Sequence, residues 1–243
     1  MTSRTAIVSG GSRGIGAAIA ERLAIDGYDV AITYARNKAA AEKIVRKIEA
    51  HGHRGLALQA DSGDVGDTAS AVSATISAFG QIDTVICNAG VYPYGPFGET
   101  SVDTINEALF VNIRGAMLLI RNALAQIKPG GHIVMIGSAF GERAPFPNIS
   151  VYAATKAALN GFAKGLSRDL GQRGITVNVV QPGPIDTELN PADGPAADLL
   201  RSYVALGQYG TTADIANLVS FLASPSAGNI TGAILSSDGG ITA

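Results

Sequence analysis

Tyr152 and Lys156 are the two residues of this 243-residue chain whose types and spacing most directly suggest chemistry. They stand four residues apart at the start of a segment, 150–171, whose apolar period predicts a helix, so the Lys156 ammonium can lie beside the Tyr152 phenol. A tyrosine has an ordinary pKa of about 10, and a nearby cation lowers that pKa because it stabilises the phenolate. Lowering it by about 3 units requires about 4 kcal/mol. A phenol tuned in this way can give a proton to an alkoxide or take one from an alcohol.

The position of the pair separates it from a second Tyr-x3-Lys spacing at residues 34–38. Ser138 follows an apolar stretch, 132–137, that predicts a strand just before the helix of the pair. A serine hydroxyl at a strand exit can donate to a carbonyl oxygen as negative charge develops on that oxygen. Each of the three residues also has a structural interpretation, namely a turn residue for Ser138, a half-buried packing ring for Tyr152 and a solvated helix lysine for Lys156.

A glycine turn near the N-terminus predicts a phosphate site. Gly10, Gly14 and Gly16 lie between a predicted strand, 5–9, and a predicted helix, 14–26, with the spacing G-x3-G-x-G. Glycines at such a turn let the backbone approach a pyrophosphate, which then meets the positive end of the helix dipole. The alternative is a tight turn whose glycines serve only close helix packing.

The second predicted strand, 29–34, indicates which dinucleotide the turn binds. An NAD site needs an acidic residue near the end of this strand, and Asp26 and Asp29 come too early in the chain to supply it. Arg36 stands near the required place and Arg13 lies in the glycine turn itself. Two guanidinium groups suit a 2'-phosphate, which predicts NADP(H). The alternative is that Arg36 only decorates the solvated start of the next helix.

Short apolar runs alternate with longer amphipathic ones along the whole chain. The runs predict strands at 5–9, 29–34, 55–60, 84–87, 132–137, 175–181 and 232–236, and helices at 14–26, 38–50, 64–79, 101–127, 150–171, 196–206 and 213–223. Such alternation predicts an α/β fold, with a parallel sheet covered by helices on both faces. We find no repeat and no linker, and so expect one domain over 1–243. Long Pro/Gly-rich excursions at 91–98 and 182–195 follow strand ends, which is where ligands bind in such sheets.

Composition narrows the possible partners. The chain is 47% hydrophobic with a net charge of −2, which excludes a disordered tail, and without a Lys/Arg run it does not suggest nucleic-acid binding. No apolar stretch is long enough for a membrane span, and the N-terminal residues lack the apolar segment of a signal peptide. We expect a soluble cytoplasmic protein. The single cysteine, Cys87, and three scattered histidines provide no metal-ligand set.

These motifs occur together in the order typical of one family. The chain resembles the short-chain dehydrogenase/reductases in the segment Ser9-Gly-Gly-Ser-Arg-Gly-Ile-Gly16, Asn88-Ala-Gly90, Asn112, Ser138, Tyr152 with Lys156, and Pro182-Gly183. The resemblance covers the whole chain. It implies a Rossmann fold, that is, a doubly wound seven-stranded parallel sheet, together with a nicotinamide cofactor and hydride transfer.

The resemblance also implies residue roles. Tyr152 is the general acid/base, Lys156 holds the ribose hydroxyls and lowers the tyrosine pKa, Ser138 binds the substrate oxygen, and Asn112 holds a water in a proton relay. Asp61 meets the adenine, while Ile185 and Thr187 contact the nicotinamide carboxamide. The cofactor as a whole is expected along Gly10, Ser12, Arg13, Gly14, Ile15, Gly16, Tyr34, Arg36, Asp61, Ser62, Asn88, Ala89, Gly90, Tyr152, Lys156, Pro182, Gly183, Ile185 and Thr187.

Two of these residues have competing interpretations, and three features depart from the family pattern. Asn112 is a poor helix former inside the predicted helix 101–127, which also suits a hydrogen-bonded buried amide. Asp61 could instead cap the helix that begins near residue 64. Ser9 replaces a threonine, Cys87 replaces an asparagine and is expected to be a small buried residue, and the loop 139–149 is one residue longer than usual.

The end of the second strand looks like that of the 3-oxoacyl-carrier-protein reductases and their ketone-reducing relatives. Loops 91–98, 139–149 and 184–208 would line the substrate site, with the side chains of Tyr92, Tyr94, Phe97, Phe140, Phe146, Glu142 and Arg143. Some of these could instead pack against other subunits. An acidic carrier protein would need basic residues around the substrate site, and the chain offers little beyond Arg121, Lys128 and Arg143. A small free ketone is therefore at least as good a candidate for the substrate.

A second reading belongs to another class of function. The segments Gly137–Arg143 and Gln181–Pro195 also look similar to biofilm-dispersal mediators, short-chain reductase homologues described as binding cyclic di-GMP. The intact Asn/Ser/Tyr/Lys set argues against a purely regulatory protein, because a binding protein needs no proton relay. Family members of this type are usually homotetramers built through the helices at 101–127 and 150–171 and the C-terminal strand, which suits the apolar runs of the first helix.

Overall fold

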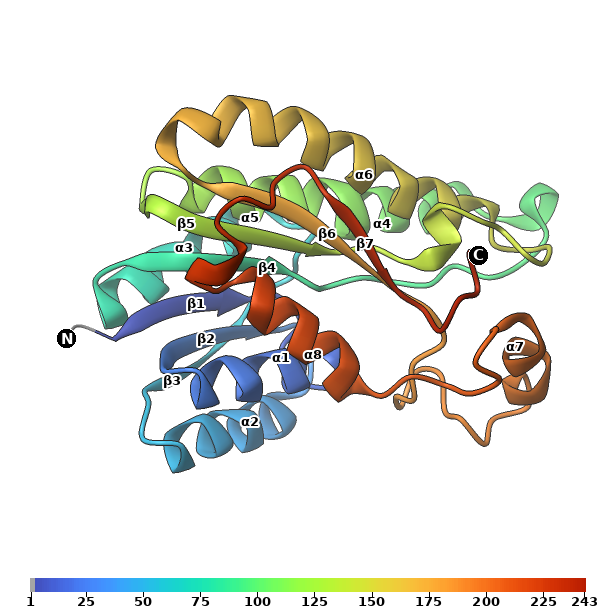
Figure 1. Ribbon diagram of the computed structural model, residues 1–243, viewed down its shortest axis with the longest axis horizontal. Coiled ribbons are helices and arrows are strands. Elements are labelled where there is room, and N and C mark those ends of the chain that lie inside the picture. The colour runs from blue at the N-terminus through green and yellow to red at the C-terminus, as the bar shows by residue number, and fades with distance from the viewer. Residues whose placement is uncertain (1–2) are drawn as a thin grey trace.

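The computed structural model describes residues 3–243 and contains one sheet of seven parallel strands (Figure 1). The spatial order is β3-β2-β1-β4-β5-β6-β7, so the chain winds outward twice from β1, once in each direction. This confirms the predicted doubly wound α/β fold. The strands are β1 Arg4–Val8, β2 Tyr28–Tyr34, β3 Gly55–Gln59, β4 Ile82–Cys87, β5 Ile127–Ile136, β6 Thr176–Pro182 and β7 Ile234–Ser237. Met1 and Thr2, part of the segment that argued against a signal peptide, lie outside the described residues.

Helices cover both faces of the sheet. They are α1 Gly14–Ile25, α2 Lys38–Ala50, α3 Val65–Phe79, α4 Val102–Ala108, α5 Gly115–Ala123, α6 Ser150–Leu170, α7 Ala197–Tyr203 and α8 Thr212–Leu222. Helices α1, α2 and α8 pack on one face, while α3, α5 and α6 pack on the other (Figure 1). Alternation along β1 explains the two cores, because Ala6 and Val8 face the first layer and Ile7 faces the second. Helix α7 stands apart, beyond the carboxyl ends of the strands.

The predicted helix 101–127 is wrong as a single continuous helix. It is α4, then a π-helical segment, Leu109–Arg114, then α5, and the chain has already entered β5 at Ile127. A π-helical turn contains about one residue more than an α-helical turn, and the apolar period of the sequence does not reveal this difference. Asn112 lies in the π-helical segment and is buried. The helix ends early because Pro129, Gly130 and Gly131 cannot continue it, and Ile127 instead pairs with Ile82 of β4. The other predicted elements are present, with ends that differ by a few residues, as for β7 and the shorter α7.

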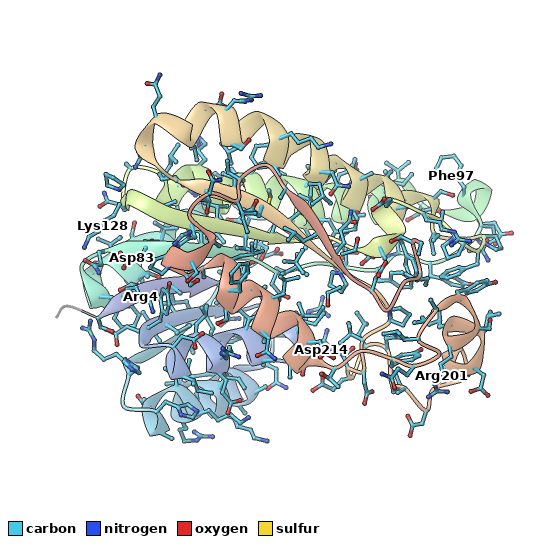
Figure 2. The ribbon with its side chains drawn as sticks, viewed as in Figure 1. Arg4, Asp83, Phe97, Lys128, Arg201 and Asp214 are labelled. Carbon is cyan, nitrogen blue, oxygen red and sulfur yellow. The ribbon has the colours of Figure 1, made fainter. Side chains whose placement is uncertain are left out.

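Polar side chains lie at the amino-terminal ends of the strands. Figure 2 shows Arg4, Asp83 and Lys128 at this edge, with Arg201, Asp214 and Phe97 toward the opposite end. The Asp83 carboxylate accepts a hydrogen bond from the Thr5 amide at 2.8 Å. The carboxyl edge, by contrast, carries the long loops in which the candidate residues lie. Over residues 3–243, no helix combines the length and apolar character needed to cross a membrane.

Candidate active site

The site forms where the exit of β5 meets the first turns of α6. The Lys156 ammonium nitrogen Nζ donates to the carbonyl oxygen of Ile136, the last residue of β5, at 2.8 Å. A Cβ on Gly141 would lie 2.9 Å from backbone atoms of Lys156 and Ala157, so only glycine permits this approach. Ser138, between Ile136 and Gly141, therefore lies against the helix that carries the tyrosine and the lysine. These three predicted residues are brought together.

Ser138 keeps a donor available at this junction. Its side chain is buried, and Oγ accepts a hydrogen bond from the Phe140 amide at 3.2 Å, which caps the 3-10 turn Ala139–Gly141. The turn interpretation of Ser138 thus holds, but it uses only an acceptor lone pair. The hydroxyl hydrogen is left for an oxygen beside it, which in this structure is that of the Tyr152 phenol.

Asn112 is a fully engaged buried amide, 2% exposed. Its Oδ1 accepts from the Val91 amide at 2.8 Å, and its Nδ2 donates to the Val91 carbonyl at 3.0 Å and to Thr155 Oγ1 at 2.9 Å. Both amide hydrogens are used, so the side chain can hold a water only through the second lone pair of Oδ1. The structural interpretation of Asn112 is correct, and its role in a water relay stays a prediction.

Burial acts oppositely on the tyrosine and the lysine. The low-dielectric surroundings raise the pKa of Tyr152, and the nearby Ser138 hydroxyl opposes that rise by hydrogen bonding. Burial lowers the pKa of Lys156 to about 8. The Lys156 Nζ lies 5.7 Å from the centre of the Tyr152 ring. The sequence led us to expect a lowered tyrosine pKa. The chain's own side chains raise it instead, because desolvation of the phenol is the largest effect on that pKa.

The glycine turn is tied to the end of β4. Asn88 Nδ2 donates to the carbonyl oxygens of Ser9 and Gly10, both at 3.0 Å, and Ser9 Oγ accepts from the amides of Asn88 and Ala89. A Cβ on Gly16 would come within 2.4 Å of Asn88 Nδ2, so the first turn of α1 packs directly against the Asn88 side chain. The sequence does not predict these hydrogen bonds of Asn88, although the hydroxyl retained at Ser9 is a signal for them.

The turn forms a cradle that suits a dinucleotide phosphate. Gly14 has φ +52°, and a Cβ there would lie 3.5 Å from Thr187 Cγ2 and 3.7 Å from Glu188 Oε2. The loop after β6 therefore reaches the turn, and the absent side chain leaves the N-terminus of α1 open. Gly90 has the same effect nearer the catalytic residues, because a Cβ there would lie 3.2 Å from Asn112 Oδ1 and 3.5 Å from Lys156 Nζ. The residues present fit a nicotinamide dinucleotide that runs from the turn to Lys156.

The remaining predicted cofactor residues divide into open and enclosed positions. Arg13 and Arg36 are exposed, Ser12, Ile15, Ser62 and Thr187 are half-buried, and Tyr34, Pro182 and Ile185 are buried. Tyr34 belongs to the core under α1 and α2. Gly183 serves packing, since a Cβ there would lie 2.7 Å from the Asp238 backbone. Whether these residues touch the cofactor stays a prediction.

The alternative interpretation of Asp61 as a helix cap is wrong. Asp64 caps α3 by accepting from the Asp67 amide at 2.9 Å, whereas the Asp61 carboxylate accepts from the Gly63 amide at 2.8 Å within its own turn. The Asp61 side chain is exposed at the carboxyl edge, and its contact with adenine stays a prediction. Cys87 is buried, as expected, and burial raises the pKa of its thiol to about 12.

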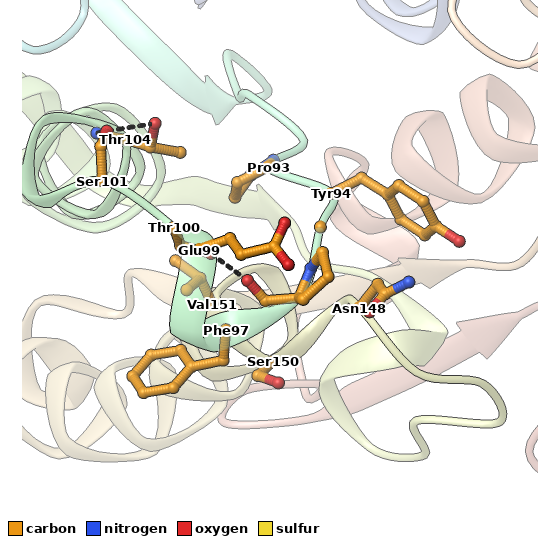
Figure 3. A pocket seen from close by; sticks show the side chains of 12 residues that line it. Pro93, Tyr94, Phe97, Glu99, Thr100, Ser101, Thr104, Asn148, Ser150 and Val151 are labelled. Carbon is orange, nitrogen blue, oxygen red and sulfur yellow. Dashed lines mark hydrogen bonds between the residues drawn. The ribbon is translucent and has the colours of Figure 1, made fainter.

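A cavity of about 370 Å³ lies on the outer side of the loop after β4 (Figure 3). It is lined by residues 93–97, 99–101 and 104 and, at the start of α6, by Asn148, Ser150 and Val151. The close-up labels Glu99, Tyr94 and Asn148 among the side chains that line it. Ser138, Tyr152 and Lys156 are not among the residues that line it.

Comparison with known proteins agrees with this geometry. A family model described as enoyl-(acyl carrier protein) reductase matches residues 10–242. The chain is 42% identical over 238 residues to a cyclic-di-GMP-binding biofilm dispersal mediator protein of Escherichia coli K12, covering 98% of this chain and 97% of that protein. It is 33% identical over 252 residues to a probable tetrahydroxynaphthalene reductase of Zymoseptoria tritici, covering 98% and 94%. A short chain dehydrogenase of Burkholderia cenocepacia, crystallised with NADP, is 48% identical with a TM-score of 0.98, covering 99% and 98%.

Replacing Gly141 by alanine tests the close approach of β5 and α6. We expect Gly141→Ala to lower the free energy of unfolding by about 1–3 kcal/mol, because the methyl group must push the 3-10 turn off the helix backbone. Gly171→Ala is the matched control, since Gly171 has helical angles and open space around it. Urea unfolding at one protein concentration measures both. Equal stability of the two variants would contradict the tight contact.

The titration of Lys156 tests its burial. We expect the ammonium signal of Lys156, assigned in ¹³C-lysine NMR spectra by its loss in Lys156→Met, to titrate near pH 8. Between about pH 8 and pH 10.4 the unfolded chain then binds more protons at this residue than the folded chain. Wild type should therefore gain stability relative to Lys156→Met as pH rises through that window. A midpoint above pH 10 would show that water reaches the amine.

Proposed function

The chain belongs to the short-chain dehydrogenase/reductase family, and from that premise we propose that it is an NADPH-dependent carbonyl reductase that converts a ketone to an alcohol. The observation that carries the proposal is the junction at which Ser138, Tyr152 and Lys156 meet. A serine hydroxyl, a protonated phenol and a buried amine lie beside a glycine cradle. Carbonyl reduction needs this set, because it needs a donor to the oxygen, a proton source and a bound reductant.

The cofactor of this proposal is NADP(H), and when bound it supplies the hydride. Gly10, Gly14 and Gly16 would admit its pyrophosphate at the N-terminus of α1. Arg13 and Arg36 are exposed on the side where the adenosine 2'-phosphate would lie, and β2 ends there without an acidic residue. Lys156 would hold the ribose hydroxyls. A similar chain from Burkholderia cenocepacia was crystallised with NADP, which supports this choice.

The chain's own residues then handle the oxygen and the proton. Ser138 Oγ–H donates to the carbonyl oxygen and stabilises negative charge that develops there. Tyr152 gives its phenolic proton to the same oxygen, which completes the alcohol. The Lys156 ammonium, with a pKa of about 8, remains charged at neutral pH and stabilises the phenolate left behind. Asn112 would carry a replacement proton through a water, as the family resemblance implies.

The substrate would enter from the carboxyl edge of the single domain, between loops 91–98, 139–149 and 184–208. Aromatic side chains meet there, because Phe140 contacts Phe146 edge-to-face and Phe146 contacts Tyr203 of α7. Aromatic side chains at the entrance favour a small free ketone. The similarity to a probable tetrahydroxynaphthalene reductase also supports reduction of a small free molecule.

A homotetramer is part of the same proposal. The outer surface of α4, the π-helical segment and α5 leaves Val102, Leu109, Phe110 and Met117 exposed, with Val102 at 70%. Several exposed apolar side chains on one stretch of helix are consistent with a subunit contact there. Sedimentation velocity should give the mass of four chains of 24.7 kDa, and a monomer at micromolar concentration would contradict the proposal.

A regulator that binds cyclic di-GMP is the second candidate. It is favoured by the 42% identity to the Escherichia coli protein that is named for this ligand. Its weakness is that binding alone gives no reason for a buried lysine, a serine hydroxyl and a tyrosine to meet at one strand exit. Turnover and ligand binding distinguish the two candidates.

The deciding experiment is NADPH and NADH oxidation by the purified protein over a panel of ketones and 3-oxoacyl thioesters. We expect turnover with NADPH, a loss of about 100-fold or more in kcat for Tyr152→Phe, and unchanged NADPH binding in that variant. Arg36→Leu should weaken NADPH binding by about tenfold to a hundredfold and leave NADH binding unchanged, because one charge-assisted contact is removed. Equal turnover with both cofactors would contradict the 2'-phosphate assignment. Cyclic di-GMP binding without turnover would favour the regulator.

A further inference from the structure

The ring of Tyr92 touches the ring of Tyr152. Their centroids lie 4.7 Å apart and their planes meet at 74°, which is the edge-to-face arrangement that aromatic pairs prefer. Tyr92 comes from the loop after β4, whereas Ser138, whose hydroxyl also meets the Tyr152 phenol, follows β5. Tyr92 is 38% exposed, and Tyr152 is half-buried beneath it. The phenol of Tyr152 is therefore bounded by Ser138 on one side and by an aromatic ring on another.

The backbone beside Tyr92 is held by two hydrogen bonds. Both polar groups of Val91 bond to Asn112, with the amide donating to Oδ1 and the carbonyl accepting from Nδ2. Paired bonds of this kind fix the position and the orientation of a peptide unit. Tyr92 follows directly, so its ring is carried by a fixed backbone although it lies in a long Pro/Gly-rich loop.

The same asparagine is also connected to Tyr152. Asn112 Nδ2 donates to Thr155 Oγ1, and Thr155 Oγ1 donates to the Tyr152 carbonyl oxygen at 2.8 Å. The contacts close a ring from the Tyr92 side chain to the Tyr152 side chain, then through Thr155, Asn112 and Val91 back to Tyr92. Contacts thus connect both the backbone and the ring of Tyr152 to the buried amide of Asn112.

We propose that Tyr92 is a positioning residue, whose ring holds the phenol of Tyr152 in the orientation that faces Ser138. The expected effect on kcat rests on the proposed function, whereas the expected effect on the position of the Tyr152 ring does not. Because the contact is between rings, the aromatic ring of Tyr92 matters and its hydroxyl does not. No hydrogen bond of that hydroxyl occurs among the described residues.

Tyr94 provides a matched control for the geometry. Its ring stacks on Tyr92 at 6.1 Å and 17°, it belongs to the same loop, and it is 62% exposed. It makes no aromatic contact with Tyr152 among residues 3–243. Removing the Tyr94 ring deletes the same kind of side chain from the same loop without touching the phenol.

Three variants of Tyr92 separate the contributions of its aromatic ring, its hydroxyl and its apolar volume. Tyr92→Ala removes the contact, and we expect kcat to fall by at least about tenfold while the KM for NADPH stays within about twofold. Tyr92→Phe keeps the ring and should restore kcat to within about twofold of wild type. Tyr92→Leu keeps apolar volume without the ring, and it serves if the alanine variant fails to fold. Unchanged kcat in Tyr92→Leu, or a loss in Tyr92→Phe as large as in Tyr92→Leu, would overturn the proposal.

The pH profile gives a readout that a merely structural role would not change. Around the Tyr152 phenol lie the Tyr92 ring, the Ser138 hydroxyl and the Lys156 ammonium, and burial raises its pKa. Opening the Tyr92 side to water lowers that pKa. The basic limb of kcat for ketone reduction, which requires the phenol, should therefore move to lower pH in Tyr92→Leu and stay in place in Tyr92→Phe. A limb that stays in place in both variants would contradict the positioning role.

Crystal structures keep the test independent of turnover. With NADP added, Tyr92→Leu should show a displaced or doubled Tyr152 ring, whereas Tyr92→Phe and Tyr94→Ala should keep the wild-type ring position. If the wild-type enzyme reduces no ketone in the panel, the proposed function fails while this comparison still decides the positioning role. A Tyr152 ring that is unmoved in Tyr92→Leu overturns it.

Discussion

The close contact between the end of β5 and the first turns of α6 is the constraint on which the site depends. A protein interior is packed so densely that one added methyl group forces its neighbours to move. Gly141 is the residue that allows the contact, because a Cβ there would overlap the backbone of Lys156. The hydrogen bond from Lys156 to the Ile136 carbonyl then spans the gap. Ser138 and Tyr152 come from segments separated in sequence by the loop 139–149, and this packing makes them neighbours whatever path the loop takes.

Two amide side chains, the buried Asn112 and the half-buried Asn88, extend that constraint to the rest of the carboxyl edge. Asn112 joins the loop after β4 to α6, and Asn88 joins the end of β4 to the glycine turn after β1. A buried amide that leaves a donor unpaired costs free energy, so a fully bonded one admits few alternative arrangements. The π-helical segment fits this requirement, because it lets Asn112 reach both Val91 and Thr155 from inside a helix. Strand ends that would otherwise only lie near each other are in this way held in register.

The parts of this structure that the sequence predicts are those governed by local period and by strand ends. Alternating apolar runs predict the sheet, and the carboxyl ends of parallel strands place Ser138, Asn88 and the glycine turn at one edge. The break in helix 101–127 could not be predicted, since a π-helical residue disturbs the apolar period too little to be seen. The choice of Asp64 over Asp61 as the cap of α3 differs by three residues, which is within the usual error of a predicted helix start. The contact of Tyr92 with Tyr152 depends on the path of a loop whose hydrogen bonds come from a distant asparagine.

The spacing between Tyr152 and Lys156 does not by itself give the direction in which the pKa of Tyr152 shifts. Four residues of separation place a cation near the phenol, and the sequence therefore predicts stabilisation of the phenolate. The fold also buries Lys156 and partly buries Tyr152, which raises the pKa of the tyrosine and lowers that of the lysine. Lys156 directs its ammonium at a carbonyl oxygen, 5.7 Å from the ring centre. At neutral pH the phenol is then protonated and the lysine is charged. A site in that state is ready to give a proton to a carbonyl oxygen, whereas taking one from an alcohol would first require the ionisation that burial opposes. In this structure burial therefore sets the protonation state of the Tyr152 phenol more than its spacing from Lys156 does.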